Sequence, residues 1–225
     1  MSKLSSSVNS DGPPSFDESF WKDHPLESIL SRISYRPPTP QDIPRCWEIE
    51  AASYPPDEAA TLERLYYRQA HATNYFQCAI LDNEQIIGFV CSTRCLEFRE
   101  ESMATHIPTG PYLAIHSVVV HPDYRRQGIA SAVLQTYLQN VQKDNVQDER
   151  IQSVVLLSKA HLLGFYVNCG FQVNRPSPII HGQELWYELE KPLTSIKSLP
   201  GVDESWFCKT EQFKRPYVEI KPYLE

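Results

Sequence analysis

The sequence predicts an α/β domain in which helices cover both faces of a mixed sheet. The 225 residues are 41% hydrophobic, enough for one sizeable core with a tail at each end. Apolar runs of strand length alternate with helical patterns, in the order strand, two helices, three strands, helix, strand, helix, strand. The helix predicted over 129–140 should join parallel strands over 112–120 and 153–157.

The beginning of the domain carries clear local signals. A strand is predicted over 33–36. A helix should run from Pro40 to about Ala52, because Thr39 can cap it and proline fits its first position. Apolar residues at helical spacing predict a second helix over 58–72.

The remaining elements follow from similar signals. A charged connection is expected over 142–150. A short helix over 162–168 should end at Gly170, which suits a left-handed C-cap. Runs rich in β-branched and aromatic residues predict the other strands, over 76–81, 85–94, 171–173 and 185–190.

Two terminal segments differ in composition from the domain predicted over 29–191. Residues 1–28 are rich in Ser, Pro, Asp and Lys, and we expect them to form a flexible N-terminal tail. Residues 192–225 carry Trp206 and four other aromatic residues. We therefore expect this C-terminal extension to pack on the domain.

Charge and cysteine usage narrow the classes of function. The formal net charge is -7 and no long block of Lys and Arg exists, which argues against a nucleic-acid partner and suits a cationic substrate. The six cysteines form no Cys-x-x-Cys pair, so neither a metal site nor a disulfide framework is predicted. Because the sequence shows no apolar signal core and no apolar run of membrane-spanning length, we expect a cytoplasmic protein without a membrane partner. We also expect the protein to be a monomer.

A strand, a basic turn and a helix start follow one another between His116 and Ser131. The apolar strand ends in Val118, Val119 and Val120, and basic and small residues then lead into the predicted helix. Unpaired N–H groups and the positive end of the macrodipole favour an anion at a helix N-terminus. The sequence therefore predicts an anion-binding turn.

The spacing Arg125-x-x-Gly128-x-Ala130 resembles the pyrophosphate-binding turn of the GCN5-related N-acetyltransferases, the GNAT superfamily. A second string of that superfamily, Phe-Tyr-x-x-x-Gly-Phe, stands at 165–171. The resemblance implies the GNAT fold, a mixed, mostly antiparallel sheet with a splayed parallel strand pair, and acetyl-CoA as co-substrate without a metal. It implies that strand backbone pairs with pantetheine and the turn binds pyrophosphate, through Val118, Val119, Val120, Arg125, Arg126, Gln127, Gly128, Ile129, Ala130 and Ser131.

Further strings narrow the resemblance to the arylalkylamine (serotonin) N-acetyltransferases, over about residues 35–190. They are Tyr35-Arg36-x-x-Thr39-Pro40-x-Asp42, Glu48-Ile49-Glu50, Tyr54, the pair His116 and His121, and Phe165-Tyr166. The string Pro-Pro-Asp-Glu-Ala-Ala at 55–60 is similar to the fungal members. Vertebrate members carry two histidines one residue apart on the strand. This chain has Ala114 in place of the first, which implies a proton route through one histidine.

His116 is the candidate general base. An alkylamine is almost wholly ammonium at pH 7, and a histidine can accept its proton near neutral pH. Strict alternation along the strand would place His116 on the same face as Ala114, Val118 and Val120. A histidine satisfied within the core is the alternative interpretation, and His121 is a weaker candidate for the base.

Tyr166 is the candidate general acid. It lies on the short helix after the second splayed strand, from which it can point into the split between the strands. A phenol is protonated at rest and can donate a proton to a leaving thiolate. A tyrosine that only packs in the core is the alternative.

The resemblance places the amine pocket at the loop after the first helix and at the last strands. The substrate-binding residues predicted there are Tyr54, Pro55, His181 and Trp186. Aromatic and proline walls suit an indole or phenyl ring, or a cation through cation–π contact. Asp57, Glu58 and Glu63 add negative charge that suits a polyamine, or else Asp57 and Glu58 only favour a helix N-terminus.

The sequence thus predicts an acetyl-CoA-dependent N-acetyltransferase. Its predicted substrates are small arylalkylamines of the serotonin, tryptamine or phenylethylamine type, acetylated on the primary amine by direct transfer in a ternary complex. A polyamine acetyltransferase is the first alternative. A protein or histone acetyltransferase, which needs an open groove for a peptide, and a non-catalytic acyl-CoA-binding sensor are the others.

Overall fold

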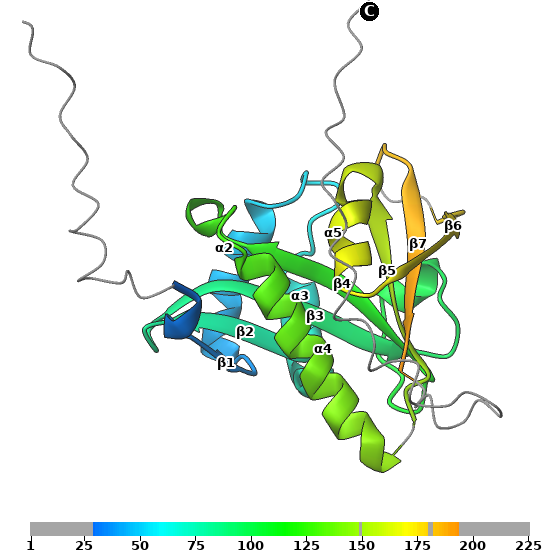
Figure 1. The fold of residues 1–225 in the computed structure, drawn as a ribbon, viewed down its shortest axis with the longest axis horizontal. Helices are drawn as coiled ribbons and strands as arrows, with labels where there is room; N and C mark the ends of the chain where they lie inside the picture. The colour runs from blue at the N-terminus through cyan, green and yellow to red at the C-terminus, as the bar shows by residue number, and fades with distance from the viewer. Residues whose placement is uncertain (1–28, 149, 180–181, 194–225) are drawn as a thin grey trace, which may run out of the picture.

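The computed structural model describes residues 29–148, 150–179 and 182–193 (Figure 1). Seven strands form one sheet in the order β1-β2-β3-β4-β5-β7-β6, in which β4 and β5 are parallel and all other neighbours antiparallel. The bounds are Ile33–Arg36 (β1), Phe76–Leu81 (β2), Gln85–Cys95 (β3), Tyr112–Val120 (β4), Ser153–Lys159 (β5), Gln172–Pro176 (β6) and Trp186–Pro192 (β7). The predicted mixed, mostly antiparallel sheet is confirmed.

Helices cover both faces of this sheet. The α-helices in the described residues are Ile43–Ala51 (α2), Leu62–His71 (α3), Ile129–Asp148 (α4) and Leu163–Asn168 (α5). Figure 1 shows α4 crossing the front of β3 and β4, while α2 and α3 lie behind the sheet. Short 3-10 turns add Ile29–Arg32 (η1), Pro40–Asp42 (η2), Thr73–Tyr75 (η3), Glu100–Met103 (η4), Pro122–Tyr124 (η5) and Ala160–Leu162 (η6).

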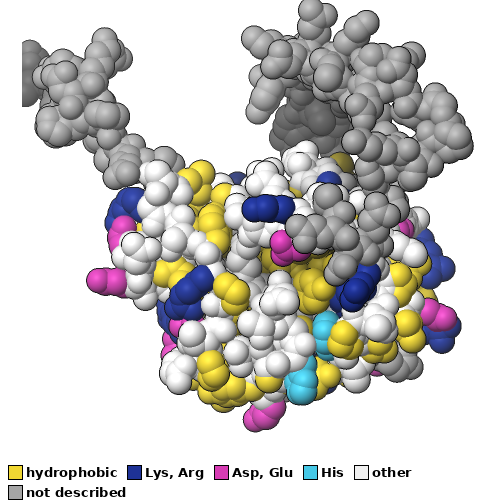
Figure 2. All heavy atoms as spheres, turned by 90° about the horizontal axis from the view of Figure 1, so that it is seen from below, with side chains coloured by type: hydrophobic (Ala, Val, Ile, Leu, Met, Phe, Trp, Pro, Cys, Tyr) yellow, Lys and Arg dark blue, Asp and Glu magenta, His cyan; other side chains and the backbone are white. Residues whose placement is uncertain are grey.

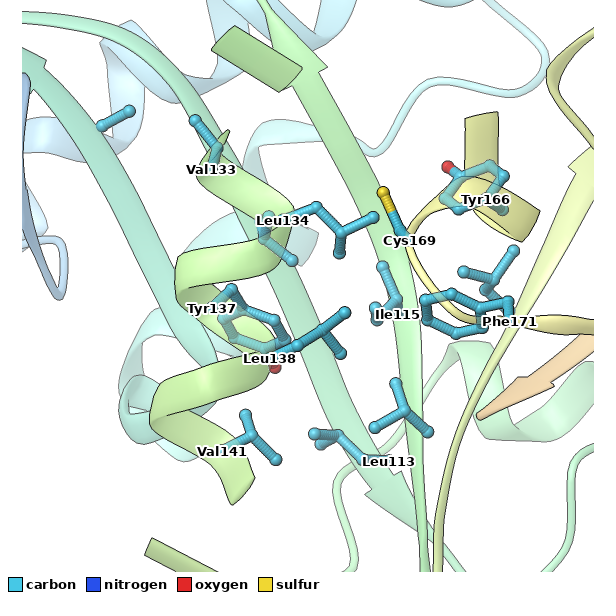
Figure 3. Packing of buried hydrophobic residues seen from close by; sticks show 14 of the residues in the cluster. Leu113, Ile115, Val133, Leu134, Tyr137, Leu138, Val141, Tyr166, Cys169 and Phe171 are labelled. Carbon is cyan, nitrogen blue, oxygen red and sulfur yellow. The ribbon is translucent and has the colours of Figure 1, made fainter. Parts of the chain in front are cut away.

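Each face of the sheet has its own hydrophobic core. On one face, Leu134 and Tyr137 of α4 pack with Leu113 of β4, and residues around α5 extend the same cluster (Figure 3). On the other face, Ile49 of α2 and Leu65 of α3 lie in a second cluster over β2 and β3. Burying each such side chain contributes about 1.5–3 kcal/mol, so the two clusters fix the sheet between its helices.

The end of α4 differs from the prediction. The helix continues to Asp148, through most of the segment expected as a charged connection over 142–150. Val141 and Asn145 extend its buried side by one turn each. The Asn145 amide also bonds the backbone N–H and carbonyl of Ile151, at 2.9 and 2.8 Å. These contacts tie the last turns of α4 to the chain that enters β5.

The start of α3 was also predicted wrongly. The helix begins at Leu62, four residues after the expected start at Glu58. The Thr61 hydroxyl accepts a hydrogen bond from the Arg64 N–H at 3.2 Å and so caps the helix. The segment before Thr61 is therefore a loop, which changes the role of its acidic residues.

The predictions for the tails over 1–28 and 192–225 concern residues that, apart from 192–193, lie outside the described part. Within the described residues, no helix is both long and apolar enough to cross a bilayer. The described cysteines Cys46, Cys78, Cys91, Cys95 and Cys169 are buried and free. On the face shown in Figure 2, basic side chains are scattered and do not form a continuous stripe.

Candidate active site

The parallel strands β4 and β5 separate halfway along their length. Their ladder runs from Tyr112 opposite Ser153 to Ile115 opposite Leu156 and ends there. A narrow cavity of about 30 Å³ lies at this point, lined by Tyr54, Glu58, Ile115, His116, Val118, Leu156, Leu157, Tyr166 and Trp186. The predicted split is therefore present, and both candidate catalytic residues line it.

A β-bulge in β4 determines where His116 points. In the ladder with β3, Cys91 lies opposite Ser117 and Ser92 lies opposite Ile115, so His116 is the extra residue. The predicted strict alternation is therefore wrong at this point: Val118 and Val120 pack with the α4 core, whereas His116 contacts Thr93, which lies opposite Ala114. The bulge turns His116 toward the α3 side while Val118 stays on the other face.

The imidazole of His116 is held at one nitrogen and open at the other. Nε2 lies 2.7 Å from Thr93 Oγ1. Nδ1 is buried and has no hydrogen-bond partner among the described residues. Burial, and to a lesser degree the charges of Arg68 and Arg64, hold the pKa of His116 well below its usual 6.5. The ring is therefore neutral at pH 7 and able to accept a proton.

Tyr166 lies on the β5 side of the split. It is buried on α5, edge-on between Phe165 and Phe171, with ring centroids 4.8 and 5.9 Å away. Figure 3 shows its hydroxyl turned away from Phe171. Burial raises the pKa of Tyr166, so the phenol keeps its proton at neutral pH.

The turn before α4 has the backbone shape of an anion cradle. Arg126 and Gly128 have positive φ values of 64° and 78°. A Cβ added at Gly128 would meet nothing within 4 Å, so a ligand has open access to its backbone. Arg126 and Gln127 are exposed, whereas Ile129 is buried and anchors the helix start. The predicted cofactor residues of the turn thus lie together around an accessible backbone.

Arg125 has a different environment from its neighbour. Its Nε donates to the Val120 carbonyl at 2.9 Å. Its Nη2 donates to the Ser53 hydroxyl at 2.9 Å and the Ala52 carbonyl at 3.3 Å. Arg125 therefore ties the turn to the end of β4 and the end of α2, and Arg126 is the better placed of the two for a phosphate.

The predicted substrate residues are only partly brought together. Tyr54 and Trp186 line the narrow cavity, and Lys159 Nζ lies 5.3 Å from the centre of the Trp186 ring. Pro55 is exposed, and its carbonyl accepts from the Glu58 and Ala59 N–H groups. His181 lies outside the described residues.

A second, larger cavity of about 670 Å³ also has His116 in its wall. Its lining comes from α2, the loop before α3, α3, η4, the strands β4 and β5, and the segments after η4 and β6. It consists of Glu50, Asp57, Glu58, Ala59, Ala60, Thr61, Arg64, Arg68, Glu100, Ala104, His116, Leu157 and Ile179. The two cavities share His116, Glu58 and Leu157. The larger cavity and the split therefore adjoin at these three residues.

Glu58 is one of the residues whose place the sequence did not reveal. It is buried, and its Oε1 lies 2.9 Å from Lys159 Nζ on β5. The interpretation that it serves a helix N-terminus is wrong, because α3 starts at Leu62. The string Pro-Pro-Asp-Glu at 55–58 was the only sequence signal at this residue. It could not reveal that Glu58 pairs with Lys159, 101 positions later in the chain.

Comparison with known proteins decides the family. The model of the acetyltransferase (GNAT) family matches residues 43–171, more than half of the chain. The chain belongs to the acetyltransferase (GNAT) family.

Individual relatives of this GNAT protein are distant. Serotonin N-acetyltransferase of Mesocricetus auratus is 30% identical over 91 residues, which are 40% of this chain and 42% of that protein. The match thus spans less than half the length of that relative. The loading GNATL domain of CurA from Lyngbya majuscula has a TM-score of 0.63 at 14% identity, over 72% of this chain and 98% of that one. NAA60 of Arabidopsis thaliana in complex with acetyl-CoA has a TM-score of 0.53 at 21% identity, over 71% of this chain and 98% of that one.

The residues of this GNAT protein fit acetyl-CoA. The cradle at Arg126 and Gly128 has the open backbone that a pyrophosphate needs. Past Ile115, β4 no longer pairs with β5. The freed edge of β4 thus offers hydrogen-bonding groups of the kind that pantetheine amides require.

Proposed function

We propose that this protein acetylates the primary amine of small arylalkylamines in a ternary complex with acetyl-CoA. The observation that carries the proposal is the position of His116, which lies in the walls of both the narrow split and the larger cavity. An amine held in the larger cavity would reach the split beside this imidazole. The proposed partner is a small molecule and the proposed functional unit is a monomer.

In the proposed mechanism, His116 accepts a proton from the substrate ammonium at Nδ1. Thr93 fixes the ring at Nε2, 2.7 Å away, so Nδ1 keeps one orientation. The lowered pKa of His116 keeps the ring neutral before the reaction. General base catalysis of this kind contributes about 10²- to 10⁴-fold in rate.

Tyr166 is the proposed proton donor to the leaving group. When bound, acetyl-CoA supplies an activated acetyl thioester. Burial keeps Tyr166 Oη protonated until negative charge develops beside it. In this mechanism the Arg126–Gly128 cradle would bind the pyrophosphate of the cofactor, and the free edge of β4 would bind its pantetheine amides.

Two observations support an arylalkylamine. Tyr54 and Trp186 give the narrow cavity aromatic walls. The 91 residues similar to a serotonin N-acetyltransferase point to the same class of amine. A different observation favours polyamines as the second candidate: among the described residues, four with carboxyl groups and none with a phenyl, phenol or indole ring line the larger cavity.

A spectrophotometric assay of free thiol tests the proposal. The purified protein is incubated with acetyl-CoA and with tryptamine, phenylethylamine, serotonin, spermidine or putrescine in turn, and the N-acetylated product is identified by mass spectrometry. We expect thiol release with the aromatic amines above the amine-free rate. Preference for spermidine would support the second candidate. Measurable acetyl-CoA binding without turnover of any amine would contradict both and leave the sensor alternative.

A further inference from the structure

Two buried polar atoms in the wall of the larger cavity have no hydrogen-bond partner among the described residues. They are Glu50 Oε2 and His116 Nδ1. Burying such an atom without a partner is costly, and native structures seldom tolerate it unless a ligand or water completes the bond. The two atoms therefore indicate what kind of group the cavity holds.

Glu50 is fixed so that one oxygen faces the cavity. It lies on α2 and is 2% exposed. Its Oε1 accepts from the Ala60 N–H at 3.1 Å and from the Ser117 hydroxyl at 2.9 Å. Ser117 follows His116 at the bulge of β4, and its hydroxyl contacts Glu50 while His116 lines the cavity. These bonds hold the carboxyl group in place and leave Oε2 as the open acceptor.

His116 also presents an acceptor to the cavity. The Thr93 hydroxyl donates to the Ser102 carbonyl at 3.4 Å, so its oxygen is left to accept from His116 Nε2–H. Nδ1 of the neutral ring then carries the lone pair. The cavity wall thus combines a carboxylate oxygen with an imidazole nitrogen, both of which need a donor.

A primary ammonium group matches this pair, because it has three N–H donors and no acceptor. We propose that Glu50 Oε2 and His116 Nδ1 together bind the protonated amino group of the substrate. Glu50 anchors the positive charge. One N–H bond of the ammonium then breaks, its electron pair stays on the substrate nitrogen, and the proton forms a new bond with Nδ1. This inference rests on the proposed function and assigns the substrate end of the same site.

The charge of Arg68 acts on both members of the pair. Burial raises the pKa of Glu50, while the bonds from Ala60 and Ser117 and the positive charge of Arg68 act against that rise. Burial, followed by the charges of Arg68 and Arg64, lowers the pKa of His116. Arg68 thus favours the ionised form of Glu50, against the effect of burial on that carboxyl group. It also favours the neutral form of the His116 imidazole. Of the described residues that line the cavity, more are acidic than basic: Glu50, Asp57, Glu58 and Glu100 against Arg64 and Arg68. The charge of the cavity wall therefore favours a cationic ligand.

The variant Glu50→Gln tests the proposal with little change of shape. The amide oxygen can keep the bonds from Ala60 and Ser117, while an N–H₂ donor replaces Oε2. A donor facing an ammonium cannot bind it. At saturating acetyl-CoA we expect the KM for tryptamine and for spermidine to rise roughly tenfold or more, as for loss of a charged hydrogen bond.

Calorimetry gives a readout that does not depend on turnover. Tryptamine and its neutral isostere tryptophol are titrated into the full chain in the presence of CoA. We expect Glu50→Gln to weaken tryptamine binding roughly tenfold or more and to leave tryptophol binding unchanged. Glu48→Gln is the matched control, because Glu48 lies on the same helix, is 58% exposed and pairs with Arg45 on the surface.

The outcomes separate this inference from the proposed function. If the wild-type protein acetylates an amine and Glu50→Gln leaves amine KM and binding unchanged, the ammonium site is wrong and the proposed function stands. If tryptamine and tryptophol lose affinity equally, Glu50 acts only on the shape of the cavity and the inference is overturned. If the wild-type protein acetylates no amine, the proposed function fails first.

Discussion

Thr93 Oγ1 lies 2.7 Å from His116 Nε2, and this contact joins β3 to β4 across the bulge. The bond fixes which nitrogen of the ring is free to accept a proton. It also orients the ring toward a cavity whose other walls include α2, the loop before α3, α3 and η4. The proton chemistry of the site therefore depends on one irregularity in a strand.

The pH at which His116 titrates is the first prediction. Burial, followed by the charges of Arg68 and Arg64, lowers its pKa well below 6.5. We expect its ¹⁵N NMR signals, assigned by their absence in His116→Gln, to titrate below pH 6.5. Arg64→Gln removes one positive charge and should move the midpoint upward. A midpoint at or above 6.5 in the wild-type protein would contradict the assignment.

The lowered pKa of His116 also makes the stability of the fold depend on pH. Because the pKa of His116 is lower in the folded state than in the unfolded state, the unfolded chain binds the proton first as the pH falls. The free energy of unfolding should therefore drop as the pH falls below about 6.5. Urea unfolding at several pH values measures this drop, and it should be smaller in His116→Gln.

Tyr166→Phe tests the proposed acid. The ring still packs between Phe165 and Phe171, so the melting temperature should change little. Amine turnover should fall by about 10²- to 10⁴-fold, because the buried proton donor is lost. The dissociation constant of acetyl-CoA should stay within about twofold. Tyr187→Phe, a half-buried residue of β7 outside the lining of the two cavities, is the control and should keep full activity. Full turnover in Tyr166→Phe would contradict the proposed role of Tyr166 as the general acid.

The two neighbouring arginines of the turn should respond differently to substitution. Arg125→Ala removes bonds to Val120, Ala52 and Ser53, and should lower the free energy of unfolding by about 1–2 kcal/mol. Arg126→Ala should leave stability nearly unchanged and weaken acetyl-CoA binding about three- to tenfold. Chemical denaturation and calorimetry on both variants check this. Equal effects of the two changes on cofactor affinity would contradict the separate roles.

Much of the fold could be predicted because the signals are local. The strands over 33–36, 76–81 and 112–120 have the predicted bounds, because residues rich in β-branched, aromatic or other apolar side chains stand next to turn residues there. Gly170 has a φ of 89° and ends α5, as expected of a left-handed C-cap. The end of α4 was missed because its buried side passes from Val141 to the polar Asn145, whose contacts with Ile151 depend on tertiary packing.

The site could be predicted less completely, because its key contacts join distant segments. His116, Tyr166 and the cradle around Gly128 followed from motifs in the sequence. Strand alternation could not reveal the bulge at His116, which depends on its register with β3. The contact between Glu50 and Ser117 spans 67 positions in the chain, so no spacing pattern could place that carboxyl group in the cavity.

The central claim is that His116 accepts the proton of a substrate amine, and the pH dependence of His116→Gln tests it most directly. At pH 7 and saturating acetyl-CoA, this variant should turn over the best amine of the panel about 10²- to 10⁴-fold more slowly than the wild-type protein. The deficit should shrink as the pH approaches 10, because a growing share of the alkylamine is then neutral without a base. Turnover by His116→Gln equal to that of the wild-type protein at pH 7, or a deficit that stays constant up to pH 10, would contradict the claim.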